Sequence, residues 1–193
     1  MNFPHPHSMP RQRGTSLIEV LVTLVIVAFG LLGVAAFQAK AQVGSVESYQ
    51  RAQAIILLDD MTSRINVNSE NAASYVATVG TGDTQPAACT GIAARAARDL
   101  CEWSAALKGA AELDASGARI GGMIGARGCI EQLVVANPAV GVCTPAVYRV
   151  SVAWQGLHET RAPALTCGKD AYGSETFRRA IGTQVTVALT TCS

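Results

Sequence analysis

An uncharged run of apolar residues near the N-terminus constrains this chain more than any other feature. From Val20 to Phe37 no side chain is charged, and Thr23 is the one polar side chain. Counted from Leu17, the segment has 21 residues and would form a helix of about 32 Å at ~1.5 Å per residue. This length matches the roughly 30 Å hydrocarbon core of a bilayer, so the sequence predicts one membrane-spanning helix.

A single carboxylate, Glu19, lies just inside the start of this run, and Arg11, Arg13 and Gly14 lie just before it. An acid at the edge of a hydrocarbon-spanning helix is costly, so it usually has a partner and a function. Basic residues that precede a membrane segment predict that the N-terminus stays in the cytoplasm and the rest of the chain is exported.

Two ordinary explanations of the run remain open. A cleavable secretory signal has an apolar core of roughly 7–15 residues followed by a small-x-small site, for which Ala39-Lys40-Ala41 is a candidate. The run is too long for this, and Glu19 is out of place within it. A plain signal anchor fits the length but leaves Glu19 and the Gly14–Thr15 junction unexplained. A mature protein that begins at Thr15, Gln42 or Met1 would identify cleavage after the glycine, signal peptidase or an anchor, respectively.

The helix is expected to continue beyond the apolar run, because no proline occurs between Pro10 and Pro86. We expect one helix from about Ser16 to about Val67, roughly 75–80 Å long at 1.5 Å per residue. Apolar residues recur at three- and four-residue steps in its outer part, which is typical of a helix with one buried face. These residues are Ala54, Leu57, Met61 and Ile65.

The remaining chain predicts an α+β head. A loop is expected around residues 80–86, a second, shorter helix with an apolar stripe over residues 92–107, and a glycine-rich loop over residues 115–128. Residues 148–155 and 181–190 alternate between apolar and polar side chains, as half-buried strands do, and residues 129–135 are a third candidate strand. Three such strands suit an antiparallel sheet packed against the outer half of the long helix.

Six cysteines lie downstream of the apolar run, and no two have the Cys-x-x-Cys spacing of zinc or redox motifs. Export to an oxidising compartment favours disulfides, although some of the six could be buried free thiols. Six cysteines allow fifteen pairings. A helix that starts near Gly91 argues against one of them, because Cys89 and Cys101 would be ~15 Å or more apart, beyond the ~7 Å that a bridge tolerates. The six are Cys89, Cys101, Cys129, Cys143, Cys167 and Cys192.

The sequence offers little support for catalysis or for nucleic-acid binding. His158 is the one histidine downstream of the apolar run, no Gly-x-Ser-x-Gly elbow accompanies it, and we expect a solvated loop histidine. The glycines of residues 121–128 lack the Gly-Lys-Ser/Thr ending of a phosphate loop. The net charge of +1 offers no field for nucleic acid. Arg178-Arg179 are expected to be solvated or to protect a sheet edge. We therefore expect no enzyme, cofactor or metal.

The N-terminal residues together resemble a type IV prepilin. A short basic leader ends in Gly14, Glu19 is the fifth residue after it, and a long apolar helix follows. Further segments resemble the type IV pilus modification proteins, the PilV-like minor pilins. These segments are residues 29–33 and 49–54, Asp60-Met61, Arg64, Asp99-Leu100, Trp103 and residues 152–156.

This resemblance implies cleavage between Gly14 and Thr15 by a prepilin peptidase, then methylation of the new amine on Thr15. Family members usually begin the mature chain with Phe, so Thr15 departs from their pattern. Thr15 and Glu19 lie one helical turn apart, so the Glu of one subunit could meet the amine of its neighbour in a staggered stack. The resemblance also implies a disulfide that closes the C-terminal loop, for which Cys167 with Cys192 is the expected pair.

The implied organisation is a cleaved leader over residues 1–14, a transmembrane and assembly segment over 15–37, an amphipathic helix over 38–68 and a periplasmic head with disulfides over 69–193. The implied function is that of a minor pilin, held in the inner membrane before it joins other minor and major pilins in a surface pilus, with effects on pilus biogenesis, adhesion or twitching motility. A type II secretion pseudopilin, or a membrane-anchored periplasmic enzyme or binding protein, remains an alternative.

Overall fold

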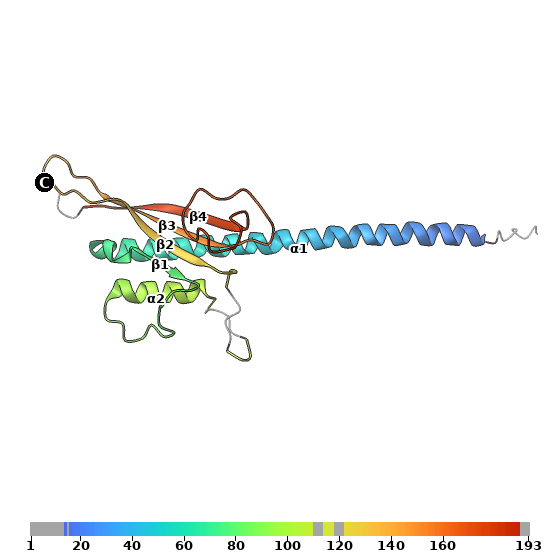
Figure 1. Cartoon of the computed structure of the whole chain (residues 1–193), viewed down its shortest axis with the longest axis horizontal. Coiled ribbons are helices and arrows are strands. Elements are labelled where there is room, and N and C mark those ends of the chain that lie inside the picture. Colours follow the sequence, from blue (N-terminus) through green and yellow to red (C-terminus); the bar gives the residue numbers. More distant parts are fainter. Residues whose placement is uncertain (1–13, 15, 110–113, 118–121, 190–193) are drawn as a thin grey trace, which may run out of the picture. The chain divides into compact units, whose positions relative to one another are not determined.

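The computed structural model describes residues 14, 16–109, 114–117 and 122–189. The chain divides into two units, Met1–Gly44 and Ser45–Ser193. In chain order the elements are helix α1, a short 3-10 helix η1, strand β1, helix α2 and strands β2, β3 and β4 (Figure 1). This is the α+β fold, a long N-terminal helix with an antiparallel sheet, that the sequence predicts.

Helix α1 extends over Leu17–Val67, as expected from the absence of proline and the apolar periodicity. Its outer part, within the second unit, buries one face against the head. The buried residues follow one another at steps of four, four, three and four, which keeps them on one side of a 3.6-residue helix. They are Gln50, Ala54, Leu58, Met61 and Ile65. The helix ends at Val67, and η1 (Ser69–Tyr75) follows after Asn68.

Four antiparallel strands form one sheet in the order β1-β2-β3-β4. The three longer strands confirm the expected ones: β2 (Arg127–Val134), β3 (Ala146–Gln155) and β4 (Arg178–Val187). Strand β1 (Ala77–Gly80) was not predicted, because four residues are too few to show an alternating pattern.

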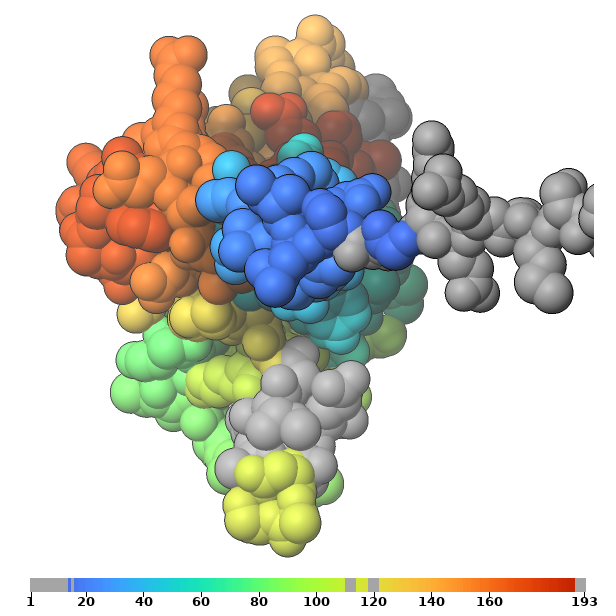
Figure 2. All heavy atoms as spheres, turned by 90° about the vertical axis from the view of Figure 1, so that its right-hand side faces the viewer, coloured from blue at the N-terminus to red at the C-terminus, as the bar shows by residue number. Residues whose placement is uncertain are grey.

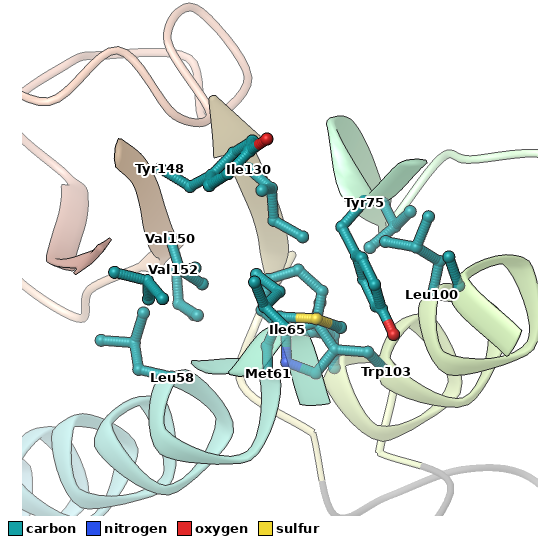
Figure 3. Close-up of a cluster of buried hydrophobic side chains, with 14 of the residues drawn as sticks. Leu58, Met61, Ile65, Tyr75, Leu100, Trp103, Ile130, Tyr148, Val150 and Val152 are labelled. Carbon is teal, nitrogen blue, oxygen red and sulfur yellow. The ribbon is translucent and has the colours of Figure 1, made fainter. Parts of the chain in front are cut away.

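Figure 3 shows the core where side chains from α1, α2 and the sheet meet. Trp103 of α2 (Arg95–Leu107) is fully buried, and its indole Nε1 donates a hydrogen bond of 2.9 Å to the Leu57 carbonyl of α1. Its ring fills the space where a Cβ on Gly128 of β2 would lie, so only glycine fits there. The apolar stripe predicted for α2 is therefore the contact that fixes this helix against both α1 and the sheet.

The predicted exclusion of a Cys89–Cys101 disulfide is wrong. The two cysteines are bonded, and their Cα atoms are 5.7 Å apart. The exclusion assumed a helix from Gly91, but α2 begins at Arg95. Gly91, at a φ of +87°, lies in a turn that brings the chain back over α2, so the helical rise does not separate the two residues.

The predicted Cys167–Cys192 pair is also wrong, because Cys167 is bonded to Cys129. This bridge joins β2 to the loop between β3 and β4, and its residues lie 38 apart in sequence. Cys143 is disulfide-bonded as well. Cys192 lies outside the described residues.

Arg178 is not a solvated or edge-protecting residue but a buried one, 3% exposed. Its guanidinium donates to the carbonyls of Leu165, Cys167 and Pro163 at 2.5, 3.1 and 3.1 Å. It also pairs with Glu175, which lowers the pKa of that carboxyl. Arg178 thus holds together the loop between β3 and β4, which Figure 2 shows in orange as a lobe separate from the green region around α2.

Asp83 ties the loop after β1 to α2. Its carboxylate accepts hydrogen bonds from the Gly80 and Gln85 amides and from Ser104, and it pairs with Lys108. Burial alone would raise the pKa of Asp83. The bonds from Lys108, Ser104 and the two amides outweigh burial and hold this pKa below its usual value.

Head stability should therefore depend on pH through Asp83. A carboxyl whose pKa is lower in the folded state stabilises the fold above its unfolded pKa of about 3.9, and this contribution is lost as pH falls through the folded pKa. In urea titrations followed by the two tryptophans, the loss of stability between pH 7 and pH 3 should be smaller in Asp83→Asn than in the unaltered chain. An equal loss in both would remove Asp83 as a source of the pH dependence.

Candidate functional site

The start of α1 brings together several of the residues that the sequence singles out. Gly14 is exposed, and Thr15 lies outside the described residues. Ser16 caps the helix, because its Oγ and its carbonyl accept bonds of 3.2 and 3.0 Å from the Glu19 amide. These bonds use the backbone amide of Glu19 and do not depend on its side chain. The Glu19 carboxylate lies in the first turn of α1, where an acid favours the positive helix end.

The apolar half of α1 exposes all its large side chains. From Leu17 to Phe37, none of these side chains is buried against another part of the described chain, and Phe29 and Phe37 are each more than 70% exposed. Thr23 satisfies its own hydroxyl by donating to the Val20 carbonyl at 2.8 Å. Between Leu17 and Phe37, Glu19 therefore carries the one acidic or basic side chain that an apolar medium would have to accommodate.

By length and composition, α1 is the one described helix that could cross a membrane. A soluble protein buries such a surface within its own fold, whereas none of this segment is buried in the chain. The backbone groups of a helix are bonded internally, so a lipid environment costs them nothing. The segment needs a membrane or a bundle of similar helices around it.

Where α1 ends, its last turn is fixed to α2 by a cluster of charges. Arg64 pairs with Asp60 at 3.0 Å, with Asp99 at 3.1 Å and with Glu102 at 2.6 Å. Burial would lower the pKa of Arg64, but the three carboxylates raise it above its usual value. Tyr75 donates to Asp99 at 2.5 Å, and burial together with this bond raises the pKa of Tyr75. These contacts hold the end of α1 in one position relative to the head.

A second polar contact involves Glu47, near the start of the second unit. Its Oε1 accepts a bond of 2.9 Å from the Leu157 amide, lies 3.1 Å from Arg179 Nη2 and lies 2.9 Å from Nδ1 of His158. His158 is 55% exposed, in keeping with the expected loop histidine, but it contacts Glu47. Arg179 was expected to be solvated or to protect a sheet edge, but its side chain is 14% exposed and pairs with Glu47. The pair was not predicted, because 132 residues separate its members.

The residues that the structure describes do not form a metal-binding site. No group of three or more His, Cys, Asp and Glu side chains in that part of the chain could hold a metal ion. Asp60, Asp99 and Glu102 do converge, but they surround the Arg64 guanidinium. A protein cation, the Arg64 guanidinium, already occupies the centre of this acidic cluster.

Comparison with known proteins gives one match. The family model for the prokaryotic N-terminal methylation motif matches residues 9–35, which include Gly14, Thr15, Glu19 and most of the apolar half of α1. No characterised protein and no solved structure shows significant similarity to the chain. The match supports a type IV pilin-like or pseudopilin precursor, which implies processing by a prepilin peptidase, assembly with other pilins and a helix suited to membrane anchoring.

Proposed function

We propose that the chain is a minor pilin of a type IV pilus, cleaved after Gly14 and incorporated into the filament through α1. The observation that carries this proposal is that the methylation motif matches residues 9–35, which include most of the apolar half of α1, whose large side chains are exposed. A helix that only anchored a protein would need the membrane alone. Glu19 in its first turn gives the helix a second requirement, a positive partner.

Cleavage after Gly14 supplies that partner. The free amine of Thr15 is positive at neutral pH, because an α-amino group has a pKa of about 7.7–8.0. In a stack of parallel helices, the Glu19 of one subunit can pair with the Thr15 amine of the next. A pair of opposite charges offsets much of the cost of placing either charge in an apolar bundle. Glu19 therefore promotes the entry of the subunit into the filament and sets its register. In this proposal the protein has no enzymatic role.

A minor role is proposed rather than that of the main building block. Major pilins tend to carry a proline partway along the apolar helix and a Phe at the start of the mature chain. This chain has Thr15 at that position and an unbroken α1 with no proline. Its exported head also carries more cysteine than is usual in pseudopilins, which favours the pilus over a type II secretion system.

Filaments sheared from the surface of the producing bacterium should contain this chain with Thr15 as its first residue. Mass spectrometry of the purified filaments would identify the N-terminal peptide, and an added methyl group would show whether the Thr15 amine is modified. A precursor that accumulates when the prepilin peptidase is inactivated would serve as the control. A chain that is found only in the inner membrane, or that begins at Met1 or Gln42, would contradict the proposal.

The two alternative functions, a pseudopilin and a membrane-tethered enzyme or binding protein, predict different experimental results. A pseudopilin would be required for secretion of folded proteins and dispensable for surface filaments. A tethered enzyme or binding protein would work as a soluble head and would tolerate any residue at position 19. Such a head has to begin near Ser45 rather than near Ser69, because Ala54, Met61 and Ile65 of α1 are fully buried in its core.

A further inference from the structure

The two margins of the sheet differ in how well they are protected. At one margin, β1 has four residues and turns away at once, where Asp83 binds the Gly80 amide at 2.8 Å. At the other margin, β4 has ten residues (Figure 1). Edge strands present unpaired backbone groups, and proteins usually protect them by shortness, charge, proline or a bulge.

The hydrogen bonds at the start of β4 show which of its backbone groups face outward. In an antiparallel pair, residues alternate between those whose N–H and C=O both face the partner strand and those that face away from it. The amide of Gly156, just after β3, donates to the Phe177 carbonyl at 2.8 Å. The amide of the preceding residue, Gln155 at the end of β3, donates away from β4 to the Ile124 carbonyl at 2.8 Å. Continuing this alternation along the register, the groups that face outward belong to Arg178, Ala180, Gly182, Gln184 and Thr186.

Of these five residues, Arg178 alone has an outward backbone group that is hydrogen-bonded within the described chain. The Arg178 amide donates to the Glu175 carbonyl at 3.2 Å. Within the part of the chain that the structure describes, no hydrogen bond occupies the outward backbone groups of the other four residues. Every residue from Ala180 to Leu189 is uncharged, and proline is absent. Among the residues that the structure describes, nothing gives this edge the usual protection against a further strand.

We propose that the outer edge of β4, from Ala180 to Thr186, binds an extended segment of another protein in the filament as a fifth strand of the sheet. This edge is about 20 Å long at roughly 3.3 Å per residue, so it fits a segment of about seven residues. The partner segment is uncharged, because the edge offers no counter-ion, and main-chain hydrogen bonds hold it. The proposal rests on the proposed function, which supplies the filament.

A second copy of β4 fits this edge less well than a different protein does. Two identical edges that pair in the antiparallel manner are related by a twofold axis, which inverts one head relative to the other. Subunits of a filament built on parallel helices share one polarity. The parallel alternative forms slanted, slightly less stable hydrogen bonds. The partner strand therefore comes from a different subunit.

Residue-resolved hydrogen exchange on the full chain tests this inference, with the chain purified in detergent and with the chain in sheared filaments. In detergent, the amides of Ala180, Gly182, Gln184 and Thr186 should exchange quickly, while those of Ile181 and Val185, which face β3, should exchange slowly. In filaments, the four outward amides should exchange at least about tenfold more slowly. Unchanged exchange in filaments would overturn the proposal. So would concentration-dependent protection of these amides in detergent, because it would identify self-pairing.

Variants at Gln184 provide a second measurement. Gln184→Pro removes an outward N–H and no internal bond, and Gln184→Ala is the matched control that keeps the N–H. The proline variant should be at least about fivefold depleted from filaments, and the alanine variant should not. Thr186→Lys, which places a charge at the edge, should also be depleted from filaments. This variant still tests the proposal if the proline variant fails to fold. Equal amounts of all four chains would contradict the inference. Absence of the unaltered chain from filaments would instead contradict the proposed function.

Discussion

Replacing Glu19 by Gln should leave the chain in the inner membrane but deplete it from filaments by at least about tenfold. The bond that begins the helix runs from the backbone amide of residue 19 to Ser16, so the helix start should persist in this variant. Only the negative charge is removed, and the Thr15 amine of a neighbouring subunit would then have no partner in an apolar bundle. The measurement is quantitative mass spectrometry of this chain in sheared filaments and in membranes.

Two controls make this result specific to the charge. Thr23→Ala removes the other polar side chain of the segment, whose hydroxyl is already satisfied by the Val20 carbonyl, and should enter filaments normally. Glu19→Ala removes both the charge and the polar side chain, and should be at least as depleted as Glu19→Gln. Normal incorporation of Glu19→Gln would show that the charge of Glu19 is not needed for assembly.

Removing the disulfide between β2 and the loop after β3, with Cys129→Ala and Cys167→Ala together, should destabilise the head by about 4 kcal/mol in the chain-entropy model. The bridge closes a segment of 38 residues, and its loss enlarges the unfolded ensemble. It also frees the loop that Arg178 organises. Urea unfolding of the full chain in detergent measures the change, because both tryptophans, Trp103 and Trp154, are buried in the head and report on it alone.

The other described bridge is the matched control. Cys89→Ala with Cys101→Ala opens a loop of 12 residues and should cost about 3 kcal/mol in the same model. The first pair should therefore unfold at a lower urea concentration than the second, with a similar dependence on urea. The reverse order would mean that native contacts of the loops, rather than chain entropy, set the contribution of each bridge.

Features with a regular period could be predicted from sequence. The 51 residues of α1 and the three long strands follow from apolar periodicity and the position of proline. The stripe that ends at Trp103 and Leu107 predicts a buried face for α2. Gly14 and Glu19, the residues proposed for processing and assembly, stand out because a small residue and a charge interrupt local patterns.

Features that depend on contacts between distant residues could not be predicted. A turn at Gly91, rather than a helix start, decides whether Cys89 reaches Cys101. Glu47 meets Arg179 across 132 residues, and no local pattern marks either of them. Arg178 looks like a solvated charge in sequence, because the three carbonyls that surround it come from a loop without periodicity. Such contacts follow from the path of the chain, which is set by the whole core.

The bridge between Cys129 and Cys167 has a consequence for maturation, because it is not formed between consecutive cysteines. Cys143 lies between them and is itself bonded elsewhere. If the part of the chain after the apolar run is exported in sequence order, Cys143 reaches the oxidising compartment before Cys167. Rapid oxidation would then join Cys129 to Cys143 in a non-native disulfide. The native bridge would require attack of the Cys167 thiolate on this disulfide. Formation of the native head would in this way depend on thiol–disulfide exchange.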